Sequence, residues 1–206
     1  MLTLFHAPHT RSSRIVTLLD ELGALDDVDI RIVSIPRQDG SGRQDPANPH
    51  PEGKVPLLID GGETIWETVA IAQHLTNRFP GAMAPAPRER GHGTYLAWLS
   101  WYAAVVEPVM VLGAAGIDDP ICRATFRGMP ELTARLAKAL EGSPYLMGER
   151  YGAADLILAS PFAWFPDATP DVPAIRDWVR RTQDRDAVRR TAARDEAWMK
   201  GQAVAA

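Results

Sequence analysis

The stretch GKVPLLIDGGETIWET, from Gly53 to Thr68, places a proline where a strand would otherwise gain hydrogen bonds to its neighbour. Proline lacks a backbone N–H, so within sheets it occurs at edges, at first residues, at bulges or after a cis peptide bond. A cis bond between Val55 and Pro56 would turn the main-chain N–H and C=O of Val55 outward, where an extended peptide could pair with them. The alternative is a trans Pro56 that simply opens the strand.

Glu67 and Thr68 follow eleven residues after Pro56, where the pattern changes from strand to helix. The unpaired N–H groups and the dipole of a helix N-terminus favour a bound carboxylate, and Thr68 adds a hydroxyl. An ionised Glu67 only accepts hydrogen bonds, so it suits an ammonium group beside that carboxylate. The alternative is ordinary capping, in which both side chains serve only their own helix. With the outward edge at Val55, the first interpretation predicts a receptor for a small peptide with free α-amino and α-carboxyl groups.

The elements that must position these residues follow from the spacing of apolar side chains. Ile15, Leu18 and Leu22 recur at helical spacing before Gly23, a residue that commonly ends helices. The Gly61-Gly62 pair between two short apolar runs is a hairpin signal. The whole pattern predicts a strand over 2–5, a helix over 11–23, a strand over 28–35, a loop over 36–53, two strands around Gly61-Gly62 and a helix ending at Phe79.

A second domain is predicted after residues 80–87, PGAMAPAP, which form a Pro- and Ala-rich connector. Beyond this linker the strand pattern ends and only helical patterns follow. An α/β domain over 1–79 and an all-helical domain over 88–206 are therefore expected. The predicted helices of the second domain cover about 88–116, 120–141 and 153–164, then VPAIRDWVRRTQ and RDAVRRTAARDEAWM.

Composition excludes several classes of protein. The chain of 206 residues is 46% hydrophobic and 23% charged, which is ordinary for a folded globular protein. Its net charge of −4 offers no basic footprint, so we expect neither nucleic acid nor a membrane surface as a partner. The single cysteine, Cys122, fits a reducing compartment, and the first residues lack the features of a secretion signal. We therefore expect a cytoplasmic protein.

One segment, Tyr95–Ile117, is long and apolar enough to imitate a membrane span. Glu107 and Pro108 lie inside it. A carboxylate near the centre of a bilayer costs about 2.5–3.5 kcal/mol on insertion scales. A largely buried core helix is therefore the preferred interpretation.

Taken together, these features resemble the soluble, bacterial-type glutathione transferases. The resemblance covers nearly the whole chain and implies an α/β plus all-α architecture. In it, a thioredoxin-like βαβαββα domain that binds glutathione precedes a helical bundle that carries the electrophile site. Gly152 replaces the Ser or Thr that usually caps a late helix of the family, while Asp155 keeps its usual third position, so we expect the helix to form. The motifs that carry the resemblance are NPHPEGKVP (48–56), ETIWET (63–68), the linker and YLMGERYGAADLILA (145–159).

The resemblance makes the thiol of glutathione the reacting group. A thiol of pKa about 8.5 is mostly protonated at neutral pH, and lowering this pKa by about two units takes about 2.7 kcal/mol. Serine-type branches of the family carry P-x-S-x-x-x-R in the first loop, and Pro8 and Arg14 place Thr10 at the serine position. Thr10 is therefore the first candidate for the hydroxyl that activates the thiol. Ser12 is the second candidate, and backbone N–H groups alone are the third.

Other roles are also implied by the resemblance. Lys54, the main chain of Val55 beside Pro56, Glu67 and Thr68 would hold glutathione. His50 would join Lys54 at the glycine carboxylate, whereas Arg37 and Arg43 are interpreted as solvated loop residues. Trp101 and Val105 would line the electrophile site, although aromatic residues at helical spacing more often form core. His6 and His9 lack neighbouring ligands at metal spacing, so no metal is expected.

The resulting prediction is a cytosolic, homodimeric glutathione transferase that adds the glutathione thiolate to small hydrophobic electrophiles, as in detoxification. Dimerisation is an expectation from the family. A glutathione-dependent lyase, isomerase, dehalogenase or peroxidase on the same scaffold is the first alternative. The second is a non-catalytic, transferase-like protein that binds partners through its helical half.

Overall fold

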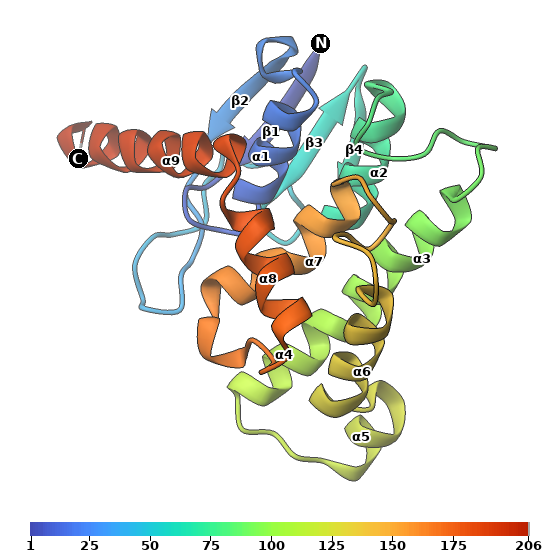
Figure 1. Ribbon diagram of the computed structural model, residues 1–206. Helices are drawn as coiled ribbons and strands as arrows, with labels where there is room; N and C mark the ends of the chain where they lie inside the picture. Colours follow the sequence, from blue (N-terminus) through green and yellow to red (C-terminus); the bar gives the residue numbers. More distant parts are fainter. Residues whose placement is uncertain (206) are drawn as a thin grey trace. The chain divides into compact units, whose positions relative to one another are not determined.

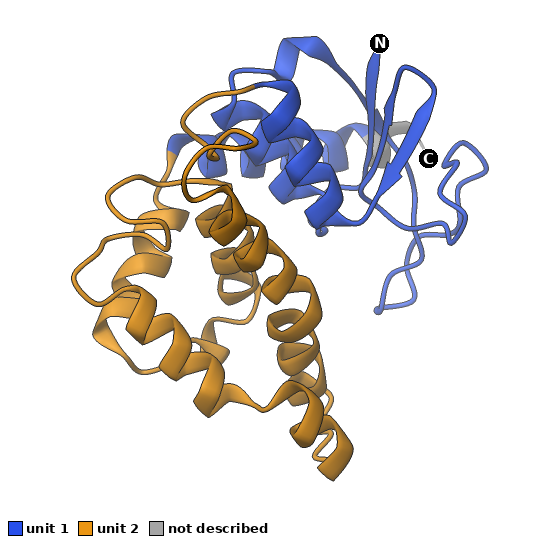
Figure 2. Ribbon diagram, turned by 90° about the vertical axis from the view of Figure 1, so that its right-hand side faces the viewer, with its two compact units in different colours: residues 1–79, 186–206 blue, residues 80–185 orange. Residues whose placement is uncertain are grey.

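A computed structural model describes residues 1–205, with side chains through residue 201. The chain forms two compact units (Figure 2). One unit comprises Met1–Phe79 together with the C-terminal segment that begins at Asp186, and the other comprises Pro80–Arg185.

The first unit is built on a four-stranded sheet of order β2-β1-β3-β4 (Figure 1). The glycines of the hairpin turn between β3 and β4 have φ of 57° and 94°, the positive values that a tight two-residue hairpin turn favours. The predicted hairpin is thus confirmed. β1 (Leu2–His6) pairs in parallel with β2 (Val28–Ile32) and antiparallel with β3 (Leu57–Asp60), which pairs antiparallel with β4 (Glu63–Trp66).

Three α-helices belong to the first unit: α1 (Ser13–Glu21), α2 (Thr68–Arg78) and α9 (Asp186–Ala205). A short 3₁₀ turn, η1 (Leu25–Asp27), leads into β2. The buried residues of α1 include the apolar positions that the periodicity marks, Ile15, Leu18 and Leu19. Helix α1 packs against both α9 and α2.

Helix α9 corrects the predicted domain boundary, because the sequence pattern assigns residues 186–206 to the helical second domain. In the structure α9 packs against α1 (Figure 1), and the Thr17 hydroxyl donates to that of Thr191 at 3.0 Å. Arg194 of α9 also donates to Asp20 of α1 at 2.7 Å, and Arg190 forms a second ion pair with the same carboxylate. These non-local polar contacts attach the helix to the first unit.

The segment between β2 and β3 differs from the βαβαββα order that the resemblance implies. Residues 33–56 contain turns and extended backbone but no helix. Side chains satisfy the backbone here instead: Asp45 accepts from the N–H groups of Ser34 and Ala47, and Asn48 accepts from the N–H of His50. Asp and Asn compete with helix formation in this way, so the loop pattern of the sequence describes the segment better than the resemblance does.

The second unit is helical. The predicted helix over 153–164 is reproduced to the residue, whereas the one predicted over 120–141 is broken at Arg127, which has a φ of 66°, and Gly128. Arg127 and Gly128 therefore separate two helices. The elements are α3 (His92–Trp101), the π-helical segment η2 (Tyr102–Val106), α4 (Glu107–Ala114), α5 (Pro120–Phe126), α6 (Met129–Ala139), α7 (Ala153–Trp164), the 3₁₀ turn η3 (Pro166–Ala168) and α8 (Pro173–Gln183).

The continuous helical stretch His92–Ala114 is long and apolar enough to cross a membrane, judged by length and composition alone. Only 33% of its most apolar window is buried, so the expectation of a largely buried helix is wrong for its outer face. Tyr95, Leu99 and Tyr102 are buried on one side, whereas Val111 is 52% exposed.

Asp155 organises the second unit from the first turn of α7. Its fully buried carboxylate accepts from the N–H of Leu146 at 2.9 Å, the N–H of Gly152 at 3.0 Å and the indole N–H of Trp178 at 2.8 Å. Burial raises the pKa of this carboxyl against the opposing effect of those hydrogen bonds. A Cβ at position 152 would lie 2.8 Å from the carbonyl oxygen of Met83, which explains glycine at this helix cap.

Replacing Asp155 by alanine should lower the free energy of unfolding by about 3 kcal/mol, because three buried donors lose their acceptor. Urea denaturation of the purified protein measures this loss. Asp177→Ala is the matched control, since it removes a carboxylate from α8 that is 54% exposed and paired with Arg180. The control should change stability by less than about 1 kcal/mol. Equal losses in the two variants would contradict the role given to Asp155.

Candidate functional site

The sheet brings three predicted binding segments together at one end of its strands. Leu57, the first residue of β3, is in register with Phe5 near the end of β1 and with Trp66 at the end of β4. The loop after β1, the residues before β3 and the start of α2 therefore leave the sheet at the same end. The charge of Glu67 raises the pKa of Lys54 and that of Arg11 lowers it, so both residues lie near Lys54.

The Val55–Pro56 peptide bond is cis, as the interpretation of Val55 as a peptide-binding edge requires. The Val55 side chain packs against the cluster formed by Phe5, Val33 and Leu57, which fixes it toward the protein. No described residue forms a hydrogen bond with the main-chain N–H or C=O of Val55. The strand begins only at Leu57, so Val55 leaves a short unpaired edge.

Glu67 and Thr68 begin α2 without capping it. Glu67 has a φ of 67°, uncommon for a residue with a Cβ, and makes no side-chain cap hydrogen bond. Within the described chain, no group hydrogen-bonds to the buried Thr68 side chain. The first helical bond runs from the Ile71 N–H to the Glu67 carbonyl at 3.0 Å, so the N–H groups before Ile71 lack acceptors within the helix. This geometry disfavours the capping alternative.

The two candidate hydroxyls of the first loop, Thr10 and Ser12, lie side by side with their oxygens 2.7 Å apart. The Thr10 hydroxyl donates to the carbonyl oxygen of Ala7 at 2.7 Å, and it accepts from the Ser12 N–H at 3.2 Å. Ser12 is fully buried and Thr10 is half-buried. Of the two residues, Thr10 is the one that is partly exposed.

Asp195 of α9 holds this loop in place, and sequence reasoning missed it. Its carboxylate, 2% exposed, accepts from His6 Nε2 at 3.0 Å, from the His9 N–H at 2.8 Å and from Ser13 Oγ at 2.6 Å. Burial alone would raise the pKa of Asp195, but these hydrogen bonds together hold it below its ordinary value. The available signal was spacing: Ala187, Thr191 and Asp195 recur every four residues, which puts an acidic residue on the buried face.

The residues predicted to hold the glycine carboxylate already contact other residues of the chain. His50 is buried, and its Nδ1 accepts from the Glu52 N–H at 3.0 Å. Lys54 is exposed and pairs with Glu52, whose hydrogen bond raises the Lys54 pKa. Arg37, interpreted from sequence as solvated, instead donates to the Pro8 carbonyl at 2.8 Å and so braces the first loop.

Trp101 and Val105, the predicted electrophile residues, both lie in the second unit and are half-exposed. The Arg135 guanidinium lies 4.8 Å from the centre of the Trp101 ring and 5.4 Å from that of Trp98. Val105 lies in the π-helical segment η2, and such segments are frequent at functional sites. Their role remains a prediction.

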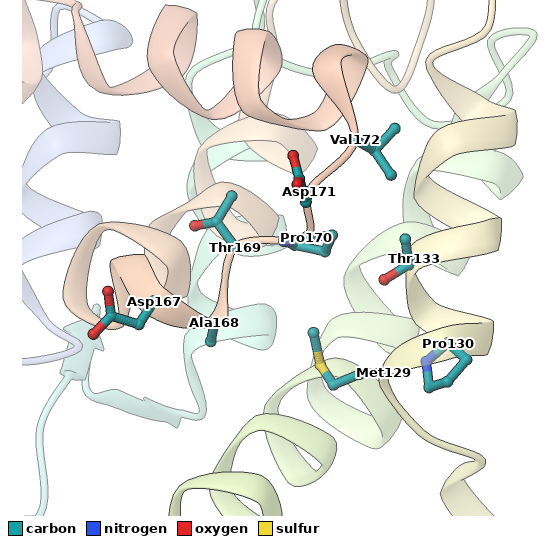
Figure 3. Close-up of a pocket in the computed structure, with 9 residues that line it drawn as sticks. All are labelled: Met129, Pro130, Thr133, Asp167, Ala168, Thr169, Pro170, Asp171 and Val172. Atoms are coloured by element: carbon teal, nitrogen blue, oxygen red, sulfur yellow. The ribbon is translucent and has the colours of Figure 1, made fainter.

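Sequence reasoning also missed a pocket of about 560 Å³ in the second unit (Figure 3). It lies between the start of α6 and the turn that connects α7 to α8. Neither Trp101 nor Val105 lines it. The lining residues are Met129, Pro130, Thr133 and 167–172.

Asp195 should make the first unit sensitive to acid. Its lowered pKa means that the ionised form stabilises the fold above the ordinary carboxyl pKa, and that this contribution is lost as the pH falls through the lowered value. Asp195→Asn should therefore lower the unfolding free energy at pH 7 by about 2 kcal/mol and flatten its dependence on pH below about 4. Denaturation at several pH values measures both effects. Glu196→Gln, at a neighbouring position 61% exposed, is the control, and identical pH dependence in the two variants would refute the assignment.

Comparison with known proteins agrees with this geometry. A family model described as the glutathione S-transferase N-terminal domain matches residues 1–77. Glutathione S-transferase 3 of Schizosaccharomyces pombe is 28% identical over 215 residues, covering 92% of this chain and 86% of that protein. A protein of Escherichia coli named disulfide-bond oxidoreductase YfcG is 27% identical, covering 91% of this chain and 92% of its own.

The solved structures show the same fold. A theta-class glutathione S-transferase from Xanthomonas axonopodis pv. citri, crystallised with glutathione bound, matches at 26% identity and a TM-score of 0.68. The match covers 93% of this chain and 96% of that one, so it includes a thioredoxin-like domain and a helical part. Residues 1–77 thus match the glutathione S-transferase N-terminal domain, and the chain as a whole is similar in sequence and fold to glutathione S-transferases.

Proposed function

We propose that this protein binds glutathione at the edge formed by Val55 and the start of α2, and transfers its thiolate to small hydrophobic electrophiles. One observation carries the proposal. The unpaired main chain of Val55 just before β3, the uncapped N-terminus of α2 just after β4, and the hydroxyl of half-buried Thr10 just after β1 lie at the same end of the sheet.

The charges of this edge match those of the tripeptide. Its γ-glutamyl end carries an ammonium group and a carboxylate, which Glu67 and the Thr68 end of α2 complement. The cysteinyl main chain would pair with Val55 as an added strand. Lys54 would release Glu52 to reach the glycine carboxylate, with His50 placing the loop beneath it through its bond from the Glu52 N–H.

Thr10 would then donate to the thiolate. A hydrogen bond to an ionised acceptor contributes about 1.5–3 kcal/mol, which covers most of what a lowering of the thiol pKa by about two units requires. Trp101 and Val105 are proposed to line the electrophile site. We also propose that the enzyme is a cytoplasmic homodimer that acts in detoxification.

A second candidate function is glutathione-dependent disulfide reduction, which the name of the E. coli relative favours. The chain contains a single cysteine, Cys122, in α5 of the second unit, and Thr10 occupies the first loop. Any such reaction would therefore use the thiol of glutathione itself. A lyase, isomerase, dehalogenase or peroxidase would use the same thiolate, so these alternatives differ in the second substrate.

Turnover of a chloronitroarene, compared with reduction of a small disulfide, separates the two candidates. The proposal predicts that the arene is conjugated with saturable kinetics, and absorbance measures the reaction. Disulfide reduction without conjugation would support the second candidate. Retention on immobilised glutathione without either reaction would support the non-catalytic alternative.

Thr10→Val should raise the pKa of the bound thiol by about one to two units while leaving glutathione affinity within about threefold, because valine keeps the shape and loses the donor. The ultraviolet absorbance of the thiolate, titrated against pH with glutathione bound, measures this pKa. Thr10→Ser is the matched control and should retain the wild-type value. A Thr10→Val protein with an unchanged thiol pKa would remove Thr10 from the role.

Glu67→Gln should weaken glutathione binding at least about tenfold, which corresponds to about 1.4 kcal/mol, because the amide no longer offers a charge to the ammonium group. Isothermal titration calorimetry measures the affinity. Glu63→Gln is the control, since Glu63 is exposed and begins β4, at the other end of the strand that leads to Glu67. Equal affinities in wild type and Glu67→Gln would rule out this placement of the amino group.

A further inference from the structure

Four side chains of the first unit form a continuous hydrogen-bonded line from the C-terminal helix to the proposed thiol site. Asp195 Oδ1 lies 3.0 Å from His6 Nε2, and His6 Nδ1 lies 2.6 Å from Ser12 Oγ. Ser12 Oγ lies 2.7 Å from Thr10 Oγ1. The line begins at a buried carboxylate and ends at a half-buried hydroxyl.

The order Asp–His–Ser resembles a nucleophilic triad, but burial excludes that use of it. Ser12 and His6 are both 0% exposed, so no substrate carbon can approach the serine oxygen. The serine is instead contacted by the hydroxyl of Thr10, a residue that is half-buried. The line can therefore act on a ligand only through Thr10.

We propose that this line is a proton relay in which His6 takes up the proton that the thiol of glutathione loses. The inference rests on the proposed function. In the resting arrangement the thiol donates to Thr10, Thr10 donates to Ser12, and Ser12 donates to His6 Nδ1. After transfer, His6 Nδ1–H donates to Ser12, Ser12 donates to Thr10, and Thr10 donates to the thiolate. As a net result, one S–H bond breaks and one N–H bond forms, so no base outside the line is needed.

Both arrangements turn the hydroxyl protons of Thr10 and Ser12 into the line and away from the Ala7 carbonyl, which lies 2.7 Å from Thr10 Oγ1 and 3.2 Å from Ser12 Oγ. His6 Nε2–H stays on Asp195 throughout, which leaves Nδ1 free to accept or to donate. The N–H of Ala7 donates to Ser12 Oγ at 3.2 Å in either arrangement, and the Ser12 N–H donates to Thr10 Oγ1 at 3.2 Å. Within the line, each hydroxyl then has one donated and two accepted hydrogen bonds while its proton reverses direction.

A buried carboxylate of α9 lies beside His6. The carboxylate of Asp195 pairs directly with it, and hydrogen bonds from Ser13 and the His9 main chain keep that carboxylate ionised. From the same helix the Trp198 ring contacts His6 edge-on at 5.1 Å between ring centres. Further titratable side chains nearby include His9, 4.0 Å from Asp195, and Glu196, 3.2 Å from His9.

Proton release on binding tests the relay in the wild-type protein. Calorimetric titration with glutathione in buffers of different ionisation enthalpy counts the protons released, and ultraviolet absorbance counts the thiolate formed. The relay predicts that clearly fewer protons leave than thiolates form, because His6 keeps them. Equal numbers would overturn the relay while leaving the proposed function intact. Absence of glutathione binding would overturn both.

Variants give an independent readout. Ser12→Ala should raise the pKa of the bound thiol by about one unit, with about tenfold less thiolate at a fixed pH below it. Asp195→Asn should act in the same direction, and the double variant should add little to either single change, because both interrupt one line. Thr17→Val is the control: it removes a buried hydroxyl between α1 and α9 and should leave the thiol pKa unchanged. An unchanged pKa in folded, glutathione-binding Ser12→Ala would overturn the relay.

Discussion

A carboxylate buried at Asp195 must be matched by donors, and this requirement ties the C-terminal helix to the loop that carries Thr10. The donors come from His6 at the end of β1, from the His9 main chain and from Ser13 at the start of α1. An unmatched buried charge would be strongly destabilising, so strand, loop and helix hold one another in a single arrangement. The position of the Thr10 hydroxyl is therefore determined by contacts that span most of the chain's length.

The segments around Val55 and Glu67 differ from the first loop, because polar groups there are left without hydrogen-bond partners. Val55 keeps its side chain in the apolar cluster with Phe5 and Leu57 and leaves its main chain unpaired. Glu67 begins α2 at a positive φ without capping it. Such unsatisfied groups persist where the surrounding fold fixes them, and they are typical of binding sites. A first loop fixed by Asp195, together with unpaired main-chain groups at Val55 and at the start of α2, suits the peptide ligand that we propose.

Local signals predicted most of the fold. The hairpin followed from its two adjacent glycines, and α7 followed from an apolar run that Asp155 begins. What local signals could not reveal depends on distant partners. Asp195 reads as a surface residue in a charged helix until the line of Ala187 and Thr191 shows that it faces inward.

The candidate site divides in the same way. Val55, Pro56, Glu67 and Thr68 were predicted because their chemistry is local to a strand edge and a helix start. Sequence alone left Thr10 and Ser12 as alternatives, since only burial distinguishes two neighbouring hydroxyls. The break near Arg127 was missed although Gly128 and Pro130, residues that commonly end and begin helices, follow it directly.

A crystal structure with reduced glutathione tests the central claim most directly. We predict that the cysteinyl main chain pairs with the N–H and C=O of Val55, with the amino group at Glu67 and the sulfur about 3 Å from the Thr10 hydroxyl. Glutathione bound elsewhere, or bound with the Val55 main chain still unpaired, would contradict the account.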